Sequence, residues 1–394
     1  MEKKDKTLNV PPLRFPEFSG EWEKYLLKSI ANIYDGTHQT PKYTKSGVPF
    51  MSVEDITKKS SSEQKYISEQ DFHNDFRNPP QKGDILMTRI GDIGTPCIVS
   101  TDEALGYYVS LALIRPLEKL QSSFLNYVIQ SDSFKRELYK RTIHVAFPQK
   151  INKEDIGKCK LDVPSIEEQS RIGNLLSLID ERITTQRKII KDLKKLKDAI
   201  THSHFKKELT HSPMVYIGQC ISQVSKRNKD AKIDRVLSVS NKYGFINQDE
   251  QFEDREVASA DTSNYKVVHK GDFAYNPARI NVGSVARLQE FENGIVSPMY
   301  VCFTAKKEFL PAYFELYLST SIFKHEMNKR LEGSVRLCLT YESLCNIKIA
   351  LPVFNVQKDF VSKVSTILTK IRAEERLLYL HHNCKQYLLS QMFI

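Results

Sequence analysis

The segment Asn78–Gln81, with the sequence NPPQ, comes closest in this chain to a catalytic motif. Enzymes that methylate the amino groups of DNA bases use an Asn/Asp-Pro-Pro-aromatic loop to hold the amino group and to stack on the flipped base. Gln81 has no ring with which to stack, and the polar residues before the segment do not form a buried strand. A convincing glycine-rich turn for the methyl donor is also missing. We therefore interpret Pro79–Pro80 as a turn that leads into Lys82-Gly83-Asp84.

The other motifs and clusters that could be catalytic or metal-binding are more typical of structural roles. The chain has neither a glycine-rich phosphate loop nor a nucleophile elbow. His202, His204 and His211 could suggest a metal, but no cysteine or carboxylate accompanies them at ligand spacing, so we interpret them as solvated helix-end residues. Glu167 and Glu168 fall in the first turn of an expected helix, where carboxylates suit the helix dipole. We predict that this chain binds no metal or cofactor and has no catalytic residues.

The composition is that of a folded protein with room for two or more domains, with 394 residues, 40% hydrophobic and 27% charged. Its seven scattered cysteines include no Cys-x-x-Cys pair, which is typical of reduced thiols inside a cell. Because we find neither a secretion signal nor an apolar run of about 18–20 residues, we predict a cytoplasmic protein that does not enter a membrane. The net charge of +10 favours polyanionic partners, as a weak indication of nucleic acid.

Two similar phrases divide the chain into halves. KGDILMTRIGDIG begins at Lys82 and KGDFAYNPARINVG begins at Lys270, 188 positions later. The same interval separates LDVPSIEEQ at Leu161–Gln169 from IALPVFNVQ at Ile349–Gln357. Periods of 20–50 residues indicate solenoids, whereas a period near 190 indicates duplicated domains. We therefore predict an internal repeat of two similar domains.

Each half contains a globular part followed by a long helix. Short apolar runs separated by Gly, Pro, Asn and Asp predict strands in the globular part, and two segments per half have helical spacing, so we expect an α+β fold. The boundaries that we predict are an N-terminal segment 1–21, a globular domain 22–163, a helix 164–208, a second globular domain 209–351 and a final helix 352–394.

The two long helices carry the same apolar stripe. Ser165 and Glu168 form a capping-box pattern at the start of the first helix, and Asn355 could cap the second. Apolar residues then recur at heptad a and d positions, with polar interruptions at Gln186, Lys197, Glu374, His381 and Lys385. We expect the helices to pair as an antiparallel coiled coil, the alternative being that each packs on its own domain. The stripe residues are Leu176, Ile179, Ile183, Ile190, Leu193 and Ile200 in the first helix, and Val364, Ile367, Ile371, Leu378 and Leu388 in the second.

In their order and duplication, these motifs resemble the specificity subunit of type I restriction–modification systems over nearly the whole chain. The resemblance implies two target recognition domains, joined by two antiparallel helices, that read a bipartite and asymmetric site in double-stranded DNA. It also implies that methylation subunits, which bind S-adenosylmethionine, and restriction subunits, which hydrolyse ATP with Mg²⁺, assemble around the chain. The motifs that carry it are LRFPEFSGEW at Leu13–Trp22, DGTHQTPKY at Asp35–Tyr43, GDILMTRIGDIG at Gly83–Gly94 and VPSIEEQSRI at Val163–Ile172.

Polar loop residues near the shared motifs are the candidates for DNA contact, because base edges and phosphates are read mainly by Arg, Lys, Asn, Gln, Ser and Thr. Arg89→Ala is expected to weaken binding at one half-site if Arg89 contacts a base. The candidates are Thr37, His38, Lys42, Tyr43, Thr88, Arg89, Gln149 and Lys150 in the first domain, and Asn276, Arg279, Asn281, Ser334 and Arg336 in the second.

Alternatives remain open at this stage. The exposed helix faces with Arg182, Arg187 and Lys191 could be solvated or could receive helices of the methylation subunits. A scaffold with two peptide-binding domains is the main rival function, and it predicts little salt dependence of binding, whereas a DNA reader loses affinity steeply as salt rises. A DNA methyltransferase acting alone through Asn78–Pro80 is the second rival.

Overall fold

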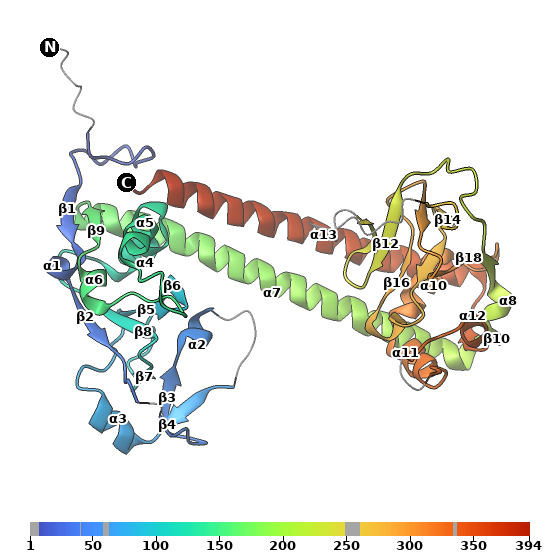
Figure 1. The fold of residues 1–394 in the computed structure, drawn as a ribbon, viewed down its shortest axis with the longest axis horizontal. Helices are drawn as coiled ribbons and strands as arrows, with labels where there is room; N and C mark the ends of the chain where they lie inside the picture. The colour runs from blue at the N-terminus through green and yellow to red at the C-terminus, as the bar shows by residue number, and fades with distance from the viewer. Residues whose placement is uncertain (1–7, 40, 58–62, 249–260, 334–336) are drawn as a thin grey trace, which may run out of the picture. The chain divides into compact units, whose positions relative to one another are not determined.

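The computed structural model describes residues 8–39, 41–57, 63–248, 261–333 and 337–394 (Figure 1). The chain forms two compact units. The first unit contains Met1–Arg187 and Arg376–Ile394, and the second contains Lys188–Glu375. The long helices α7 (Ile166–His211) and α13 (Phe354–Gln391) each contribute residues to both units. The predicted division into five segments by function stays a prediction.

The first unit is built on a four-stranded antiparallel sheet in the order β2-β8-β5-β6. A smaller sheet has the order β4-β3-β7, and β1 pairs with β9. The strands are β1 (Glu23–Leu26), β2 (Ala31–Asp35), β3 (Val48–Met51), β4 (Lys65–Ile67), β5 (Ile85–Ile90), β6 (Asp92–Ile98), β7 (Gly106–Tyr107), β8 (Leu111–Pro116) and β9 (Lys160–Val163). The short helices are α1 (Leu27–Ile30), α2 (Val53–Thr57), α3 (Glu69–Asp75), α4 (Ser122–Gln130), α5 (Asp132–Arg141) and α6 (Lys153–Gly157).

The second unit repeats this plan, with its antiparallel sheet in the order β11-β18-β15-β16. The second sheet has the order β13-β12-β17-β14, and β10 pairs with β19. The strands are β10 (Met214–Tyr216), β11 (Ile221–Val224), β12 (Val236–Ser240), β13 (Gly244–Asn247), β14 (Lys266–His269), β15 (Phe273–Tyr275), β16 (Val285–Arg287), β17 (Asn293–Val296), β18 (Val301–Ala305) and β19 (Lys348–Ala350). The helical elements are α8 (Ile217–Cys220), η1 (Ile280–Val282), α10 (Pro311–Leu318), α11 (Ser321–Asn328) and α12 (Tyr341–Cys345). The predicted α+β repeat is confirmed.

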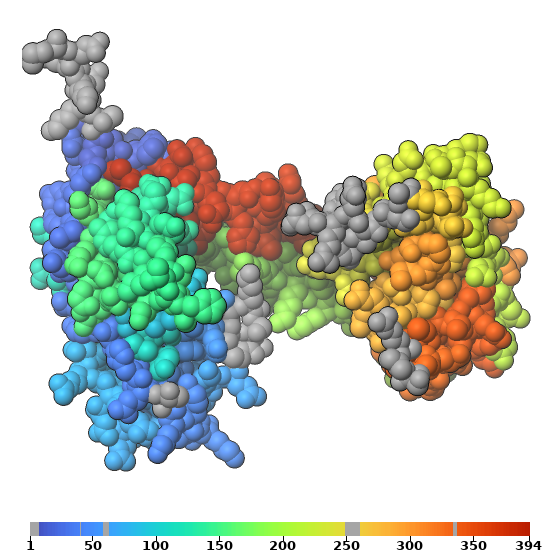
Figure 2. Space-filling model, viewed as in Figure 1, coloured from blue at the N-terminus to red at the C-terminus, as the bar shows by residue number. Residues whose placement is uncertain are grey.

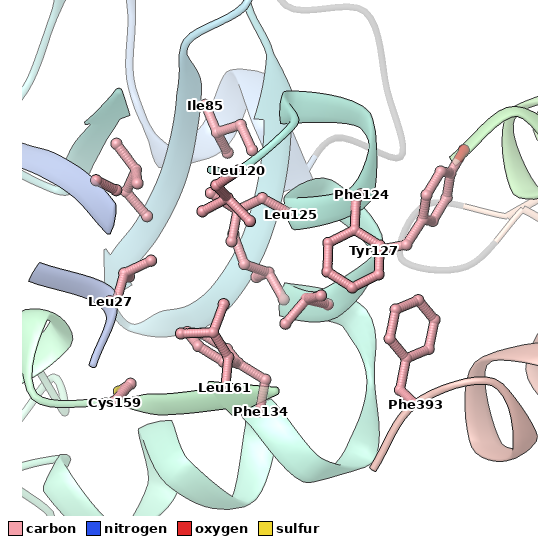
Figure 3. Close-up of a cluster of buried hydrophobic side chains, with 14 of the residues drawn as sticks. Leu27, Ile85, Leu120, Phe124, Leu125, Tyr127, Phe134, Cys159, Leu161 and Phe393 are labelled. Carbon is pink, nitrogen blue, oxygen red and sulfur yellow. The ribbon is translucent and has the colours of Figure 1, made fainter. Parts of the chain in front are cut away.

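Strands β5 and β15 are apolar without alternation because each is covered on both faces. Ile85 of β5 points into the core formed with α4 and α5, shown in Figure 3, whereas its neighbour Leu86 points into a second core beneath the smaller sheet. In β15, Phe273 and Ala274 divide between two cores in the same way. Successive side chains of a strand face opposite sides, so a strand between two cores must be apolar at nearly every position.

The repeated Lys-Gly-Asp phrase forms the same turn twice. Gly83 and Gly271 adopt φ angles of 93° and 96°, a left-handed conformation that favours glycine. The carboxylate of Asp84 accepts a hydrogen bond from the Gln81 backbone N–H at 2.8 Å, and Asp272 does the same for His269 at 2.8 Å. The turn lies at Lys82–Gly83, closed by the Asp84 N–H donating to the Gln81 carbonyl at 2.9 Å, so the prediction of a turn at Pro79–Pro80 is wrong by about three residues.

A buried glutamine near the start of each long helix also marks the repeat. The side-chain oxygen of Gln169 accepts a hydrogen bond from the Gln121 backbone N–H at 2.9 Å, and its amide donates to the Pro164 carbonyl at 3.0 Å. Gln357 makes the equivalent bonds with Leu310 and with Pro352, both at 2.9 Å. The same sequence position thus fixes the long helix to its globular domain in both halves.

In each unit, segments of the two long helices lie antiparallel. In the first unit, Leu176 of α7 shares a core with Phe393, whose ring lies 5.6 Å from that of Phe124 (Figure 3). In the second unit, Phe205 at the end of α7 lies 5.8 Å from Phe360 of α13 and 4.8 Å from Tyr313. All eleven predicted stripe residues are buried or half-buried. The coiled-coil prediction is confirmed within each unit, and the alternative that each helix packs only on its own domain is wrong.

The capping box predicted at Ser165 is only half formed. The Ser165 hydroxyl accepts a hydrogen bond from the Glu168 backbone N–H at 3.3 Å, but the Glu168 carboxylate binds Arg14 through two hydrogen bonds of 2.7 Å instead of turning back. The N-terminal segment is thereby attached to the first unit, where the red end of α13 lies against it in Figure 2. The prediction for Asn355 is wrong, because α13 already begins at Phe354.

Glu168→Ala is expected to lower the free energy of unfolding by about 2 kcal/mol, because it leaves the guanidinium of Arg14 without its buried partner. Glu167→Ala is the matched control, since it removes the same charge from an exposed position one residue earlier. Urea unfolding of both variants measures the difference. Equal destabilisation by the two substitutions would contradict the assignment.

Candidate nucleic-acid interface

In both units a loop packs against the turn that follows the central strand. In the first unit, the backbone N–H of Ile151 donates to the Arg89 carbonyl at 3.0 Å. In the second unit, Leu339 donates to the Pro277 carbonyl at 3.1 Å, and both residues lie 188 positions after their counterparts. These loop pairs hold most of the residues predicted to contact DNA.

Several predicted residues lie on exposed parts of these loops. Gln149 and Lys150 are exposed beside the β5–β6 turn, where the Gln149 carbonyl accepts a hydrogen bond from Gly91 at 2.8 Å. Arg279 and Asn281 are exposed at η1 in the second unit. The segment between β2 and β3 exposes His38, Lys42 and Tyr43.

Thr88 is fully buried and does not fit a role as a base reader. Its hydroxyl donates to the Asp92 carboxylate at 2.9 Å and accepts from the Thr95 backbone N–H at 2.9 Å. Thr37 is also buried, and its hydroxyl donates to Asp75 at 3.2 Å. Both residues stabilise turns, so we remove them from the proposed contacts.

Arg89 is 6% exposed and is used inside the first unit. Its guanidinium donates to the carbonyls of Val109 at 2.8 Å and Ile151 at 3.3 Å. It also lies 3.0 Å from the Asp35 carboxylate. The guanidinium thus connects β2, the loop before β8 and the loop before α6, so the expected base contact does not fit and we assign Arg89 a structural role.

The remaining candidates of the second unit divide into two groups. Asn276 is half-buried, and its side-chain oxygen accepts a hydrogen bond from the Ala278 backbone N–H at 3.0 Å, which shapes the turn before η1. Ser334 and Arg336 lie outside the described residues. Of this set, Arg279 and Asn281 keep exposed side chains at the interface.

A basic loop at residues 225–235 was missed in the sequence. It connects β11 to β12, as residues 36–47 connect β2 to β3. Its side chains line a hollow of about 640 Å³ together with His269. The repeat interval would have found it, because adding 188 to Thr37 and His38 gives Ser225 and Lys226. The exposed cations of this loop that line the hollow are Lys226, Arg227, Lys229 and Lys232.

The basic loop is held in shape by a buried amide. The side chain of Asn228 donates to the Ile233 carbonyl at 2.9 Å and accepts from its N–H at 3.3 Å, while the Asn228 backbone N–H donates to Tyr265 at 2.9 Å. Asp230 also lines the hollow and pairs with Lys232 at 3.2 Å, whereas the other cations repel one another unless a further anion lies between them. The arrangement therefore suits the phosphates of a nucleic-acid backbone.

The three clustered histidines have separate protein partners. His202 lies 3.1 Å from the Ser321 hydroxyl, and His204 stacks on Phe360 at 3.7 Å between ring centroids. His211 contacts the carbonyl of Lys207 at 2.8 Å. Over the described ranges, no group of three or more His, Cys, Asp or Glu side chains is placed to hold a metal ion. No described helix has the length and apolar character needed to cross a membrane.

His204 makes the second unit sensitive to acid. Burial lowers the pKa of His204 below its ordinary value of 6.5, and Lys207 and Lys363 lower it further, against an opposing effect of Glu208. The unfolded chain therefore binds this proton at a higher pH than the folded chain does, so stability falls as pH falls below 6.5.

His204→Met is expected to reduce this loss, because Met392 occupies the position 188 residues later and is buried in the first unit. Thermal unfolding of both proteins at about pH 7.5 and about pH 5.5 checks the prediction. The stability of the variant relative to that of the wild type should be greater at the lower pH. A difference in stability between the two proteins that is the same at both pH values would contradict the prediction.

Comparison with known proteins agrees with this arrangement. Residues 19–195 match the model of the type I restriction modification DNA specificity domain. The first globular domain and the start of α7 therefore resemble this family in sequence. The type I restriction enzyme MjaVIII specificity subunit of Methanocaldococcus jannaschii is 26% identical over 193 residues, which cover 47% of this chain and 45% of that protein. The match thus spans about half the length of this curated relative.

Two solved structures of type I restriction–modification proteins are similar in fold to this chain. The S subunit of the type I restriction–modification system from M. genitalium matches with a TM-score of 0.59 and 16% identity, covering 98% of this chain and 99% of that one. A structure solved for the complex assembly and conformational transition of the type I R-M system matches with a TM-score of 0.56 and 16% identity, covering 96% of this chain and 98% of that one. At this identity the likeness concerns the fold, and it extends over both halves of the chain.

Proposed function

We propose that the chain is the DNA specificity subunit of a type I restriction–modification enzyme and reads a bipartite, asymmetric site in double-stranded DNA. The observation that carries the proposal is that the same domain fold occurs twice in the chain, with different loops in each copy. The loop between β2 and β3 exposes His38 and Lys42, whereas the equivalent basic loop exposes Lys226 and Lys229. Two similar domains in one chain can read two half-sites, and different loops allow those half-sites to differ in sequence.

In this proposal the exposed residues of the loops contact the DNA. Gln149, Lys150, Arg279 and Asn281 have side chains that can reach base edges, and the cations of the basic loop are placed for phosphates. Recognition, not catalysis, is the role of the chain. Methylation subunits with S-adenosylmethionine and restriction subunits with ATP and Mg²⁺ supply the chemistry in the cytoplasm.

The surface of α13 supports the proposed assembly with methylation subunits. Exposed residues Leu377, Leu380, Cys384 and Tyr387 follow one another at intervals of three or four on α13, on a face different from the buried stripe. A helix with a second apolar face offers a surface for a partner helix. We propose that a helix of a methylation subunit packs against this face.

Leu380→Asp combined with Tyr387→Asp is expected to weaken capture of the methylation subunit at least about tenfold, because charges would face an apolar contact. Asn383→Asp is the control, since it adds a charge to an exposed position of the same helix outside the stripe. Pull-down from co-expressing cells measures the loss. Unchanged capture by the double variant would count against this docking face.

The salt dependence of DNA binding separates the proposal from its main rival. Each phosphate contact releases counterions, so log K should fall linearly with log salt concentration, with a slope of about −0.9 per contact. Fluorescence anisotropy with the assembled methylation complex measures this slope on specific and unrelated duplexes. A protein scaffold that binds peptides predicts no sequence-specific DNA binding at any salt concentration.

A further inference from the structure

The tip of the loop at residues 143–150 carries two bare apolar side chains. Val145 is 97% exposed and Phe147 is 104% exposed, more than any other large hydrophobic side chain in the described part of the chain. Single exposed hydrophobic residues are common on protein surfaces. Two at one loop tip, both almost without protein contact, need a further explanation.

The loop that presents them is braced. At its base the Ile143 N–H donates to the Lys150 carbonyl at 2.8 Å, and the Gly91 N–H donates to Gln149 at 2.8 Å. The ring of His144 contacts the Tyr139 carbonyl at 3.0 Å. The backbone on either side of the tip is therefore already ordered, which reduces the entropy lost when the tip binds a partner.

The charge around the tip favours a polyanionic partner. From Leu138 to Lys153 the sequence contains four lysine or arginine residues and no aspartate or glutamate. Glu137 pairs with Lys140 at 3.1 Å and with Arg141 at 2.8 Å, and Asp35 pairs with Lys153 at 3.6 Å. Lys150 is the cation that is exposed on the loop itself. An apolar tip beside a cation can contact stacked bases and the adjoining phosphate together.

We propose that Val145 and Phe147 form an apolar wedge that enters a base step of the half-site read by the first unit. The inference rests on the proposed function, because it requires that the chain bind DNA. Entry of an apolar side chain between base pairs partly unstacks them and kinks the duplex. The wedge would add a preference for steps that deform easily, at positions where the protein makes no hydrogen bond to a base.

The equivalent loop of the second unit has a different sequence. It is closed by paired backbone hydrogen bonds of 2.9 and 2.8 Å between Glu332 and Cys338. The sequence between them is GSVRL, without an aromatic residue. We therefore assign the wedge to the first unit, and expect only one half-site to be unstacked in this way.

The experiment uses the assembled methylation complex and its target duplex, identified by mapping methylated bases. The fluorescent base 2-aminopurine is placed in turn at each position of the site except the methylated base. Binding of the wild type should raise fluorescence at least about twofold at one step of one half-site, because unstacking relieves quenching. Phe147→Ala should abolish this rise and weaken binding about tenfold, whereas Phe147→Trp should retain it.

Phe354→Ala is the control, because it removes an exposed phenylalanine from the start of α13. Sequence-specific binding with the same fluorescence for wild type and Phe147→Ala would overturn the wedge and leave the proposed function intact. Loss of the methylation subunit from Phe147→Ala, with unchanged binding of DNA, would also overturn the wedge and indicate a protein contact. Absence of specific binding by the wild type would instead contradict the proposed function itself.

Discussion

Arg89→Ala should lower the free energy of unfolding by about 4 kcal/mol. In molecules whose first unit is unfolded, affinity for the two half-sites should fall together. The guanidinium donates to two carbonyls, those of Val109 and Ile151, and pairs with Asp35. Asp35 Oδ1 is buried and accepts no hydrogen bond from the described residues, so its charge is offset by the ion pair with Arg89 and by Lys153, 3.6 Å from the other carboxylate oxygen. Removing Arg89 leaves Asp35 with the more distant Lys153 alone and two carbonyls without their donor, which together cost several kcal/mol.

Urea unfolding and DNA binding of the same preparations test this expectation. Lys150→Ala is the matched control, since it removes a cation from the exposed part of the adjoining loop. The control should retain wild-type stability and lose affinity for DNA. An Arg89→Ala protein of unchanged stability with a loss confined to one half-site would restore Arg89 as a base reader and contradict the structural role.

Replacement of Lys226, Lys229 and Lys232 by serine is expected to weaken DNA binding by about 10²–10³-fold at about 0.1 M salt. The three ammonium groups line one hollow on a loop ordered by Asn228. Lys226 and Lys229 are placed to contact a phosphate directly, and Lys232 does so by exchanging its ion pair with Asp230, at 3.2 Å, for a phosphate. The slope of log K against log salt concentration should become shallower by about 2.7, since each lost contact contributes about 0.9. The loss should be similar on specific and unrelated duplexes, because phosphates carry no sequence information.

A second triple variant controls for net charge. Lys307, Lys324 and Lys358 are exposed in the same unit outside the basic loop, and their replacement by serine removes the same charge. Anisotropy titrations at several salt concentrations compare the two proteins. If both variants lose affinity equally, the effect comes from the overall field of the protein, and the basic loop is not a specific anchor.

The repeat and the long helices could be predicted because their signals are periodic and local. Leu176 and Ile183 of α7 lie seven residues apart, and the same spacing returns 188 positions later at Val364 and Ile371. A stripe with this spacing identifies the buried face of a helix without knowledge of the rest of the fold. The turn at Lys82–Gly83 is equally local, but it was predicted a few residues too early, at Pro79–Pro80.

The errors concern side chains whose partners are distant in sequence. Arg89 follows an apolar run and resembles an exposed loop residue, but Asp35 and Ile151 come from segments about 54 and 62 positions away. Glu168 fits a capping box, yet its carboxylate is taken by Arg14, 154 positions earlier. No local sequence pattern indicates such pairs of residues. The basic loop was different, because the repeat interval pointed to it although its own sequence had diverged.

Mapping of methylated bases across a genome, after co-expression of this chain with its methylation subunit, tests the central claim most directly. If two diverged domains each read part of one site, every methylated position should lie in one motif with two specified parts that differ in sequence and are separated by a fixed number of unspecified base pairs. A single continuous motif, a palindrome with equal halves, or methylation without sequence preference would contradict the account.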